Sequence, residues 1–311
     1  MNLTVPTAQR AQQLRELRSL LFLPANSPQL LPKATERGAD ALIVDLEDAV
    51  PLSQKAASRP LAAQAIASLA TRGAVVLLRI NSEPEQWQED LVHQPLDQLT
   101  ALMLPKVESL EQIDRLAAAV QHLGELAPAI AIQIETPRGI IEAPRICAHS
   151  RLSAVGFGGE DYSAALGVAP SSAALAWPAQ QLITSAHAFA LPCWGLAASV
   201  AEIQDLDAYT RSVGEARSMG FTGAVCIHPR QVAIVNQGFA PSPIELEWAA
   251  RVIAADLEAQ AAGIGALVLD GKMIDRPIVE RARGWLRQAS ANSASPHDGT
   301  PKQGMRLEGK P

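Results

Sequence analysis

The chain has 311 residues, of which 48% are hydrophobic, and a formal net charge of −6. This length allows one large domain or two small ones, and the acidic balance argues against nucleic acid as a main partner, because phosphate binding needs clustered Lys and Arg. No apolar run reaches the roughly 18 residues of a membrane span, the polar N-terminus lacks a signal-peptide core, and the three cysteines are far apart. We therefore expect a cytoplasmic protein without a membrane partner.

Eight short apolar runs follow one another along the chain, separated by segments with helical spacing. They cover residues 19–25, 41–45, 74–81, 101–107, 129–135, 152–157, 193–198 and 224–228. Such runs are typical of parallel strands buried on both faces. Eight β/α units within roughly 230 residues indicate a (β/α)8 TIM barrel. An open dinucleotide-binding sheet is less consistent, because no G-x-G-x-x-G motif follows the first run.

Helix boundaries and composition divide the chain into regions. Ser109 with Gln112 predicts a capping box, and Thr136 before Pro137 predicts a capped helix with proline in its first turn. We expect a lead-in over residues 1–17, the barrel over 18–240 and a C-terminal extension over 241–289, with an amphipathic helix at 243–262 and a final helix. Residues 290–311 are rich in Ser, Pro, Gly and charge, which predicts a disordered tail.

Two acids lie at the ends of consecutive predicted strands: Glu135 is the last residue of the fifth, and Asp161 comes shortly after the sixth. An unpaired carboxylate resists burial within a strand, whereas the carboxyl ends of barrel strands form the face where ligands bind. Two carboxylates there can share a hard cation such as Mg²⁺. The alternative is that both acids serve as caps or ion-pair partners, and the spacing alone does not choose between these readings.

Further charged residues end the neighbouring strands and are expected at the same mouth. Glu47 follows the second strand, Arg79 lies in the third and Lys106 lies at the end of the fourth. A planar guanidinium can clamp a substrate carboxylate with two hydrogen bonds, although Arg79 could instead pair with Glu47. Lys106 is a candidate substrate contact, with a structural ion pair to Glu47 or Glu135 as its alternative.

Long ordered motifs resemble the citrate lyase β-subunit family, which includes citramalyl-CoA and malyl-CoA lyases and is related to metal-dependent 2-oxo acid aldolases. The resemblance extends from about residue 18 to 283 and is carried by RSLLFLPA (18–25), GADALIVDLEDAV (38–50), LRIN (78–81), LPKVES (104–109), QIETPRG (133–139) and GFTGAVCIHPRQV (220–232).

The resemblance implies a barrel with Mg²⁺ held by Glu135 and Asp161, and with Arg79 contacting substrate oxygens. It also implies a homotrimer or hexamer in which the C-terminal extension reaches a neighbouring subunit's site. Asp275, in the motif GKMIDRP (271–277), matches the acid that this extension delivers. The segment after Asp161 and the Cys193-Trp194-Gly195 step depart from the family's usual pattern, which leaves the substrate open.

The sequence therefore predicts a Mg²⁺-dependent carbon–carbon lyase acting on a 3-hydroxyacyl-CoA thioester of the citramalyl-CoA or malyl-CoA type. We expect Arg79, Asp275 and Glu47 as catalytic residues, with Asp275 of the neighbour as the first choice for the acid–base group. Substrate contacts are expected from Arg79, Glu135 and Lys106. The alternatives are a CoA-independent aldolase for 2-oxo-3-deoxy sugar acids, and a non-catalytic or acyl-carrier-dependent subunit of a lyase complex.

Overall fold

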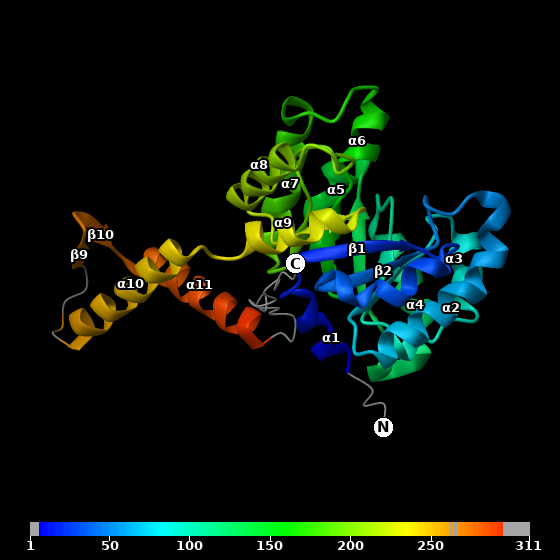
Figure 1. The fold of residues 1–311 in the computed structure, drawn as a ribbon, viewed down its shortest axis with the longest axis horizontal. Helices are drawn as coiled ribbons and strands as arrows, with labels where there is room; N and C mark the ends of the chain where they lie inside the picture. Colours follow the sequence, from blue (N-terminus) through cyan, green and yellow to red (C-terminus); the bar gives the residue numbers. More distant parts are fainter. Residues whose placement is uncertain (1–5, 262, 264–266, 295–311) are drawn as a thin grey trace, which may run out of the picture. The chain divides into compact units, whose positions relative to one another are not determined.

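The computed structural model describes residues 6–261, 263 and 267–294, which divide into two compact units at Phe239 and Ala240 (Figure 1). The first unit contains one sheet of eight parallel strands, as predicted. Its strands are β1 (Ser19–Pro24), β2 (Ala41–Asp45), β3 (Val76–Arg79), β4 (Ala101–Leu104), β5 (Ala129–Ile134), β6 (Leu152–Phe157), β7 (Cys193–Trp194) and β8 (Ala224–Cys226).

The strand order makes this sheet a nearly closed barrel. Neighbours run β7-β6-β5-β4-β3-β2-β1-β8, and an isolated parallel bridge between Trp194 and Gly223 joins β7 to the segment before β8. The α/β barrel predicted from the sequence is therefore confirmed. Six strands are shorter than their apolar runs, because the last residues of those runs belong to loops at the carboxyl ends, and β3 also begins two residues after its run.

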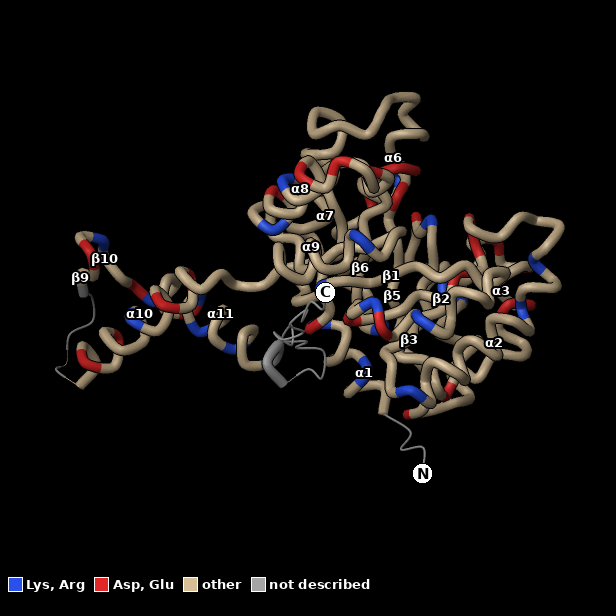
Figure 2. Tube along the Cα trace, viewed as in Figure 1, with Lys and Arg blue, Asp and Glu red and all other residues tan. Residues whose placement is uncertain are grey.

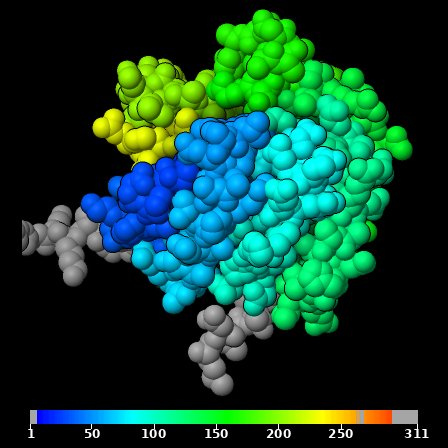
Figure 3. Space-filling model, turned by 90° about the vertical axis from the view of Figure 1, so that its right-hand side faces the viewer, coloured from blue at the N-terminus to red at the C-terminus, as the bar shows by residue number. Residues whose placement is uncertain are grey.

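Helices surround the strands in the expected alternation. They are α1 (Thr7–Leu14), α2 (Lys55–Thr71), α3 (Pro84–Leu91), α4 (Leu110–Val120), α5 (Pro137–Cys147), α6 (Gly159–Leu166), α7 (Ser172–Ala188), α8 (Leu206–Met219) and α9 (Pro229–Phe239). The predicted caps are present, since the N–H of Ser109 donates to Gln112 Oε1 at 3.0 Å and Thr136 Oγ1 accepts from the N–H of Gly139 at 3.1 Å. Figure 3 shows the segments following one another around this unit, from blue to green.

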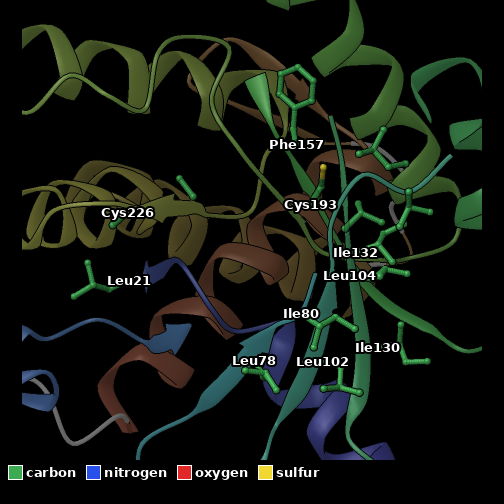
Figure 4. Packing of buried hydrophobic residues seen from close by; sticks show 14 of the residues in the cluster. Leu21, Leu78, Ile80, Leu102, Leu104, Ile130, Ile132, Phe157, Cys193 and Cys226 are labelled. Atoms are coloured by element: carbon green, nitrogen blue, oxygen red, sulfur yellow. The ribbon is translucent and has the colours of Figure 1, made fainter. Parts of the chain in front are cut away.

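Two apolar cores separate the inside of the barrel from its outside. Along β3, Leu77 belongs to the inner core and Leu78 to the outer core between strands and helices, which is the alternation expected of a strand. Figure 4 shows Leu78 with other residues of the outer core. Small side chains such as Ala131 let the inner core fill the narrow barrel. Leu14 and Leu17, at and after the end of α1, belong to this inner core too and close its floor. The predicted lead-in is thus part of the barrel's packing.

The second unit has its own small core. It consists of α10 (Pro243–Ala261), the antiparallel strands β9 (Leu267–Leu269) and β10 (Lys272–Ile274), and α11 (Arg276–Ala294). Ile274 and Val279 are buried in it, and the rings of Trp248 and Trp285 lie 5.6 Å apart. The predicted tail boundary is wrong, because residues 290–294 continue α11; residues 295–311, with the rest of that prediction, lie outside the described residues.

A buried carboxylate holds the end of β3. Asp90 of α3 is fully buried and accepts from Arg59 Nε of α2 at 2.9 Å, from the N–H of Asn81 at 2.9 Å and from Asn81 Nδ2 at 2.6 Å. These bonds fix the loop after β3 at Asn81, two residues beyond Arg79.

Every helix in the described part of the chain is either too short or too polar to cross a bilayer.

Asp90→Ala should lower the free energy of unfolding by about 3 kcal/mol, because it leaves Arg59 and Asn81 without their buried partner. Denaturant unfolding followed by circular dichroism measures this. The matched control is Glu89→Ala, since Glu89 also pairs with Arg59 at 2.6 Å but its side chain is 67% exposed; its effect should stay within about 0.5 kcal/mol. Equal effects of the two variants would refute a structural role specific to Asp90.

Candidate functional site

The strand register brings a charged pair to the mouth of the barrel. Asp45 and Arg79 end β2 and β3 as register partners, so both side chains point inward above the inner core. Arg79 donates from Nε to Asp45 Oδ1 at 2.7 Å and from Nη2 to Oδ2 at 2.6 Å, and its guanidinium lies 4.4 Å from the centre of the Phe22 ring. Burial alone would lower the pKa of Arg79, but the hydrogen bonds and charge of Asp45 outweigh it and raise this pKa.

The remaining nitrogen of Arg79 faces Glu47. Nη1 lies 3.1 Å from Glu47 Oε2, without the alignment of a hydrogen bond, and 3.4 Å from Gln133 Oε1. Glu47 is 4% exposed, and burial raises the pKa of its carboxyl despite Arg79 and Lys106. Thus Arg79 pairs with Glu47, as the structural alternative expected, and also with Asp45, which the sequence did not single out as its partner.

Lys106 contacts the acids that follow β2 and the acid that follows β5. Its Nζ donates to Glu47 Oε1 and, at 3.3 Å, to Asp48 Oδ1, while its backbone N–H donates to Glu135 Oε1 at 2.9 Å. The backbone of Lys106 has φ of 53°, a left-handed conformation that is uncommon for a residue with a side chain. That conformation lets one residue serve both acids, and the ion pair to Glu47 matches the structural alternative.

Glu135 and Asp161 follow the adjacent strands β5 and β6, close enough for the charge of Asp161 to act on Glu135. Glu135 is 2% exposed, and its pKa is raised to about 8 by burial and by the neighbouring charges of Asp161 and Glu47. Asp161 lies in the first turn of α6, beyond the end of β6, and burial also raises the pKa of its carboxyl. Figure 2 shows red acidic segments beside α6.

Gly158 makes room for the Glu135 carboxylate. A Cβ at this position would lie 2.3 Å from Glu135 Oε2, which is closer than any real contact. Glycine at position 158 therefore leaves room for the acid that follows the adjacent strand β5. Glycine here was a visible signal, but its neighbour could not be identified without the sheet register.

A cavity of about 460 Å³ opens over these residues. Its charged lining consists of one guanidinium, Arg79, and five carboxylates from Asp45, Asp48, Glu135, Glu160 and Asp161. Lys106 instead lines a neighbouring cavity of about 360 Å³ together with Trp87 and Arg115. Carboxylate oxygens are the ligands that Mg²⁺ prefers, and Glu135 with Asp161 provides two of them. No group of three His, Cys, Asp or Glu side chains suited to a metal occurs within the described residues.

Asp275 belongs to the second unit, between β10 and the start of α11. Its side chain is exposed, and its Oδ1 accepts from the N–H of Ile278 at 3.4 Å, as a helix cap does. Of the residues predicted for the site, the barrel mouth brings together Glu47, Arg79, Lys106, Glu135 and Asp161. The assignment of Asp275 to a site stays a prediction.

Comparisons with known proteins place the chain among characterised enzymes. The model of the HpcH/HpaI aldolase/citrate lyase family matches residues 18–229. A (3S)-malyl-CoA thioesterase of Cereibacter sphaeroides is 32% identical, over 91% of this chain and 98% of the relative. Human mitochondrial citramalyl-CoA lyase is 30% identical, over 88% of this chain and 86% of the relative.

Solved structures give the same result. CitE of Mycobacterium tuberculosis, in complex with magnesium, acetoacetate and coenzyme A, is 30% identical with a TM-score of 0.71, over 89% of this chain and all of that chain. A citrate lyase β subunit from the same organism, complexed with oxaloacetate and magnesium, is 28% identical with a TM-score of 0.59, over 74% of this chain and all of that one. The chain belongs to the HpcH/HpaI aldolase/citrate lyase family.

Proposed function

We propose that this protein is a Mg²⁺-dependent carbon–carbon lyase that cleaves a 3-hydroxyacyl-CoA thioester into an acyl-CoA and a 2-oxo acid, or catalyses the reverse condensation. The observation that carries the proposal is the cavity in which the buried Glu135 and the half-buried Asp161 lie with Arg79. The relatives named citramalyl-CoA lyase and CitE, the latter solved with magnesium and coenzyme A, support the reaction class and the carrier.

The donor set of the cavity fits a divalent cation. Five carboxylates and one guanidinium leave an excess of negative charge. The pKa of Glu135 is raised first by burial and then by the charges of Asp161 and Glu47. Mg²⁺ is typically bound by one or two carboxylates and retains waters, so Glu135 and Asp161 would hold it. When bound, Mg²⁺ would polarise the substrate's carboxylate and hydroxyl oxygens, which favours loss of the hydroxyl proton.

The chain's own residues would orient the substrate and move the protons. The hydroxyl loses its proton, the adjacent carbon–carbon bond breaks, its electron pair passes to the thioester as an enolate, and the enolate takes up a proton. Nε and Nη2 of Arg79 already donate hydrogen bonds to Asp45. Nη1, which lies 3.1 Å from Glu47 Oε2, is therefore the nitrogen that would donate to a substrate oxygen. Lys106 holds Glu47, and we assign the acid–base role to Asp275 of a neighbouring subunit first and Glu47 second.

Product analysis separates the candidate reactions. Cleavage of malyl-CoA by a lyase yields acetyl-CoA and glyoxylate, whereas the thioesterase activity named for one relative would yield malate and CoA. A CoA-independent aldolase would leave malyl-CoA and citramalyl-CoA intact, and its melting temperature would not change when CoA is added. A subunit that depends on an acyl-carrier protein would be inactive alone.

Glu135→Gln and Asp161→Asn should each lower kcat/KM by roughly 10²–10³-fold, because each removes one charged metal ligand. Calorimetric titration should show that the folded variants bind Mg²⁺ more weakly than the wild type does. Chelation of the metal should inhibit the wild type reversibly. Glu108→Gln is the control, since Glu108 follows the adjacent strand β4 and accepts from Thr136 Oγ1 at 2.7 Å outside this cavity. Full activity after exhaustive chelation contradicts the metal assignment.

Arg79→Lys should lower kcat by roughly 10²–10³-fold, because one ammonium cannot grip Asp45 and also reach a reacting oxygen. The rate is measured well below the melting temperature of the variant, so that lost stability does not mimic lost catalysis. Arg59→Lys replaces another arginine of comparable exposure outside the cavity and should retain kcat. Wild-type kcat in Arg79→Lys would reduce Arg79 to a structural ion pair.

Catalysis should require an oligomer, because we assign Asp275 to the neighbouring subunit's site. Asp161→Ala and Asp275→Ala should each be inactive, and mixed oligomers of the two should regain activity at sites that combine both intact acids. Mixing Asp161→Ala with Glu135→Ala is the control and should restore nothing, since both lesions lie in the same barrel. No recovery after verified subunit exchange would place Asp275 in its own chain's site or outside catalysis.

A further inference from the structure

The cavity has two chemically different sides that follow the strand order. All of its charged lining residues lie on or after β2, β3, β5 and β6. The opposite side, formed by β1 and by residues on or after β7 and β8, is apolar, and we call it the apolar wall: Phe22, Leu196, Ala198, Val200, Val225 and Ile227. Because β7, β8 and β1 are neighbours, this wall is continuous.

A buried amide fixes the apolar wall. Gln231 of α9 is fully buried, and its Oε1 accepts from the N–H groups of Ile227 at 2.9 Å and His228 at 3.0 Å. Its Nε2 donates to the carbonyl oxygens of Val200 at 2.7 Å and Glu202 at 3.1 Å. One side chain thus ties the loop after β7 to the loop after β8, with all four of its hydrogen bonds made, so the wall is preorganised.

A second carboxylate on the substrate would have no partner at this wall. Among the described residues that line the cavity, Arg79 is the only Lys, Arg or His, and Asp45 already occupies two of its nitrogens. A charge placed against the apolar wall would lose water without gaining an ion pair. An alkyl group there would bury apolar area instead, which is favourable.

We propose that the 2-oxo acid handled by this site carries a single carboxylate and an uncharged alkyl group that lies against the apolar wall. This inference rests on the proposed function and narrows its substrate class. Relatives have been solved with pyruvate and with oxaloacetate, so membership of the family does not decide the charge of this group. The wall selects against the second carboxylate of oxaloacetate.

Two ligands of the same outline test the inference on the wild-type protein. 4-Methyl-2-oxopentanoate carries two methyl groups where oxaloacetate carries two carboxylate oxygens, so the pair differs mainly in charge. Calorimetry in excess free Mg²⁺, without CoA, should show that the alkyl acid binds roughly 100-fold more tightly. Equal binding, tighter binding of oxaloacetate, or no binding of either acid would overturn the inference.

A charge placed in the wall should weaken the preference for the alkyl acid. Val225→Arg should move the ratio of the two affinities toward oxaloacetate by roughly 10-fold or more, because it supplies a partner for the second carboxylate. Val225→Met adds length without charge and should leave oxaloacetate disfavoured. The same shift in Val225→Met would attribute the wild-type preference to shape and overturn the argument from charge; if Val225→Arg does not fold, the wild-type ligand pair still decides.

Binding without CoA keeps this inference separate from the proposed reaction. Selective binding of the alkyl acid together with no cleavage of any CoA thioester would refute the lyase while supporting the apolar wall. Cleavage of a thioester together with equal affinity for both 2-oxo acids would support the lyase and refute the wall.

Discussion

The buried ion pair between Asp45 and Arg79 organises the mouth of the barrel. It joins adjacent strands in register and fixes the guanidinium above the Phe22 ring. Removing two charges from water is costly, and such a pair is weak evidence for stability. Its contribution is orientation: with Nε and Nη2 engaged, Nη1 can point only toward Glu47 and the cavity. The remaining acids and Lys106 are arranged around this fixed cation.

Much of the fold could be predicted because its signals are local. Strands buried on both faces require apolar runs, and Thr136 with Pro137 marks a helix start in any context. The acids at the strand ends were also visible, since parallel strands place their carboxyl ends together. What escaped prediction depends on register or on backbone conformation. Asp45 is the partner of Arg79 only through the β2–β3 register, and the left-handed backbone of Lys106 has no sequence signature.

The division of the cavity into a charged and an apolar side follows from barrel geometry. Alternate residues of each strand point inward, so the residue type at the last inward position of each strand sets the chemistry of one sector of the mouth. β2 and β3 end in Asp45 and Arg79, whereas β8 contributes Val225 and β1 contributes Phe22. A substitution at one strand end can therefore change one sector of the mouth while the acidic sector stays the same.

The floor beneath the barrel bears on how the domain can be delimited. The family match begins at residue 18, yet Leu14 and Leu17 lie just before it and belong to the inner core. Arg10 of α1 also donates to the carbonyl oxygens of Leu126 and Asp97 at 2.6 Å each. These hydrogen bonds attach α1 to the segments that precede β4 and β5. A fragment trimmed to the matched region would leave the alanine-lined interior open to water from below. The packed barrel therefore begins before the first residue of the family match.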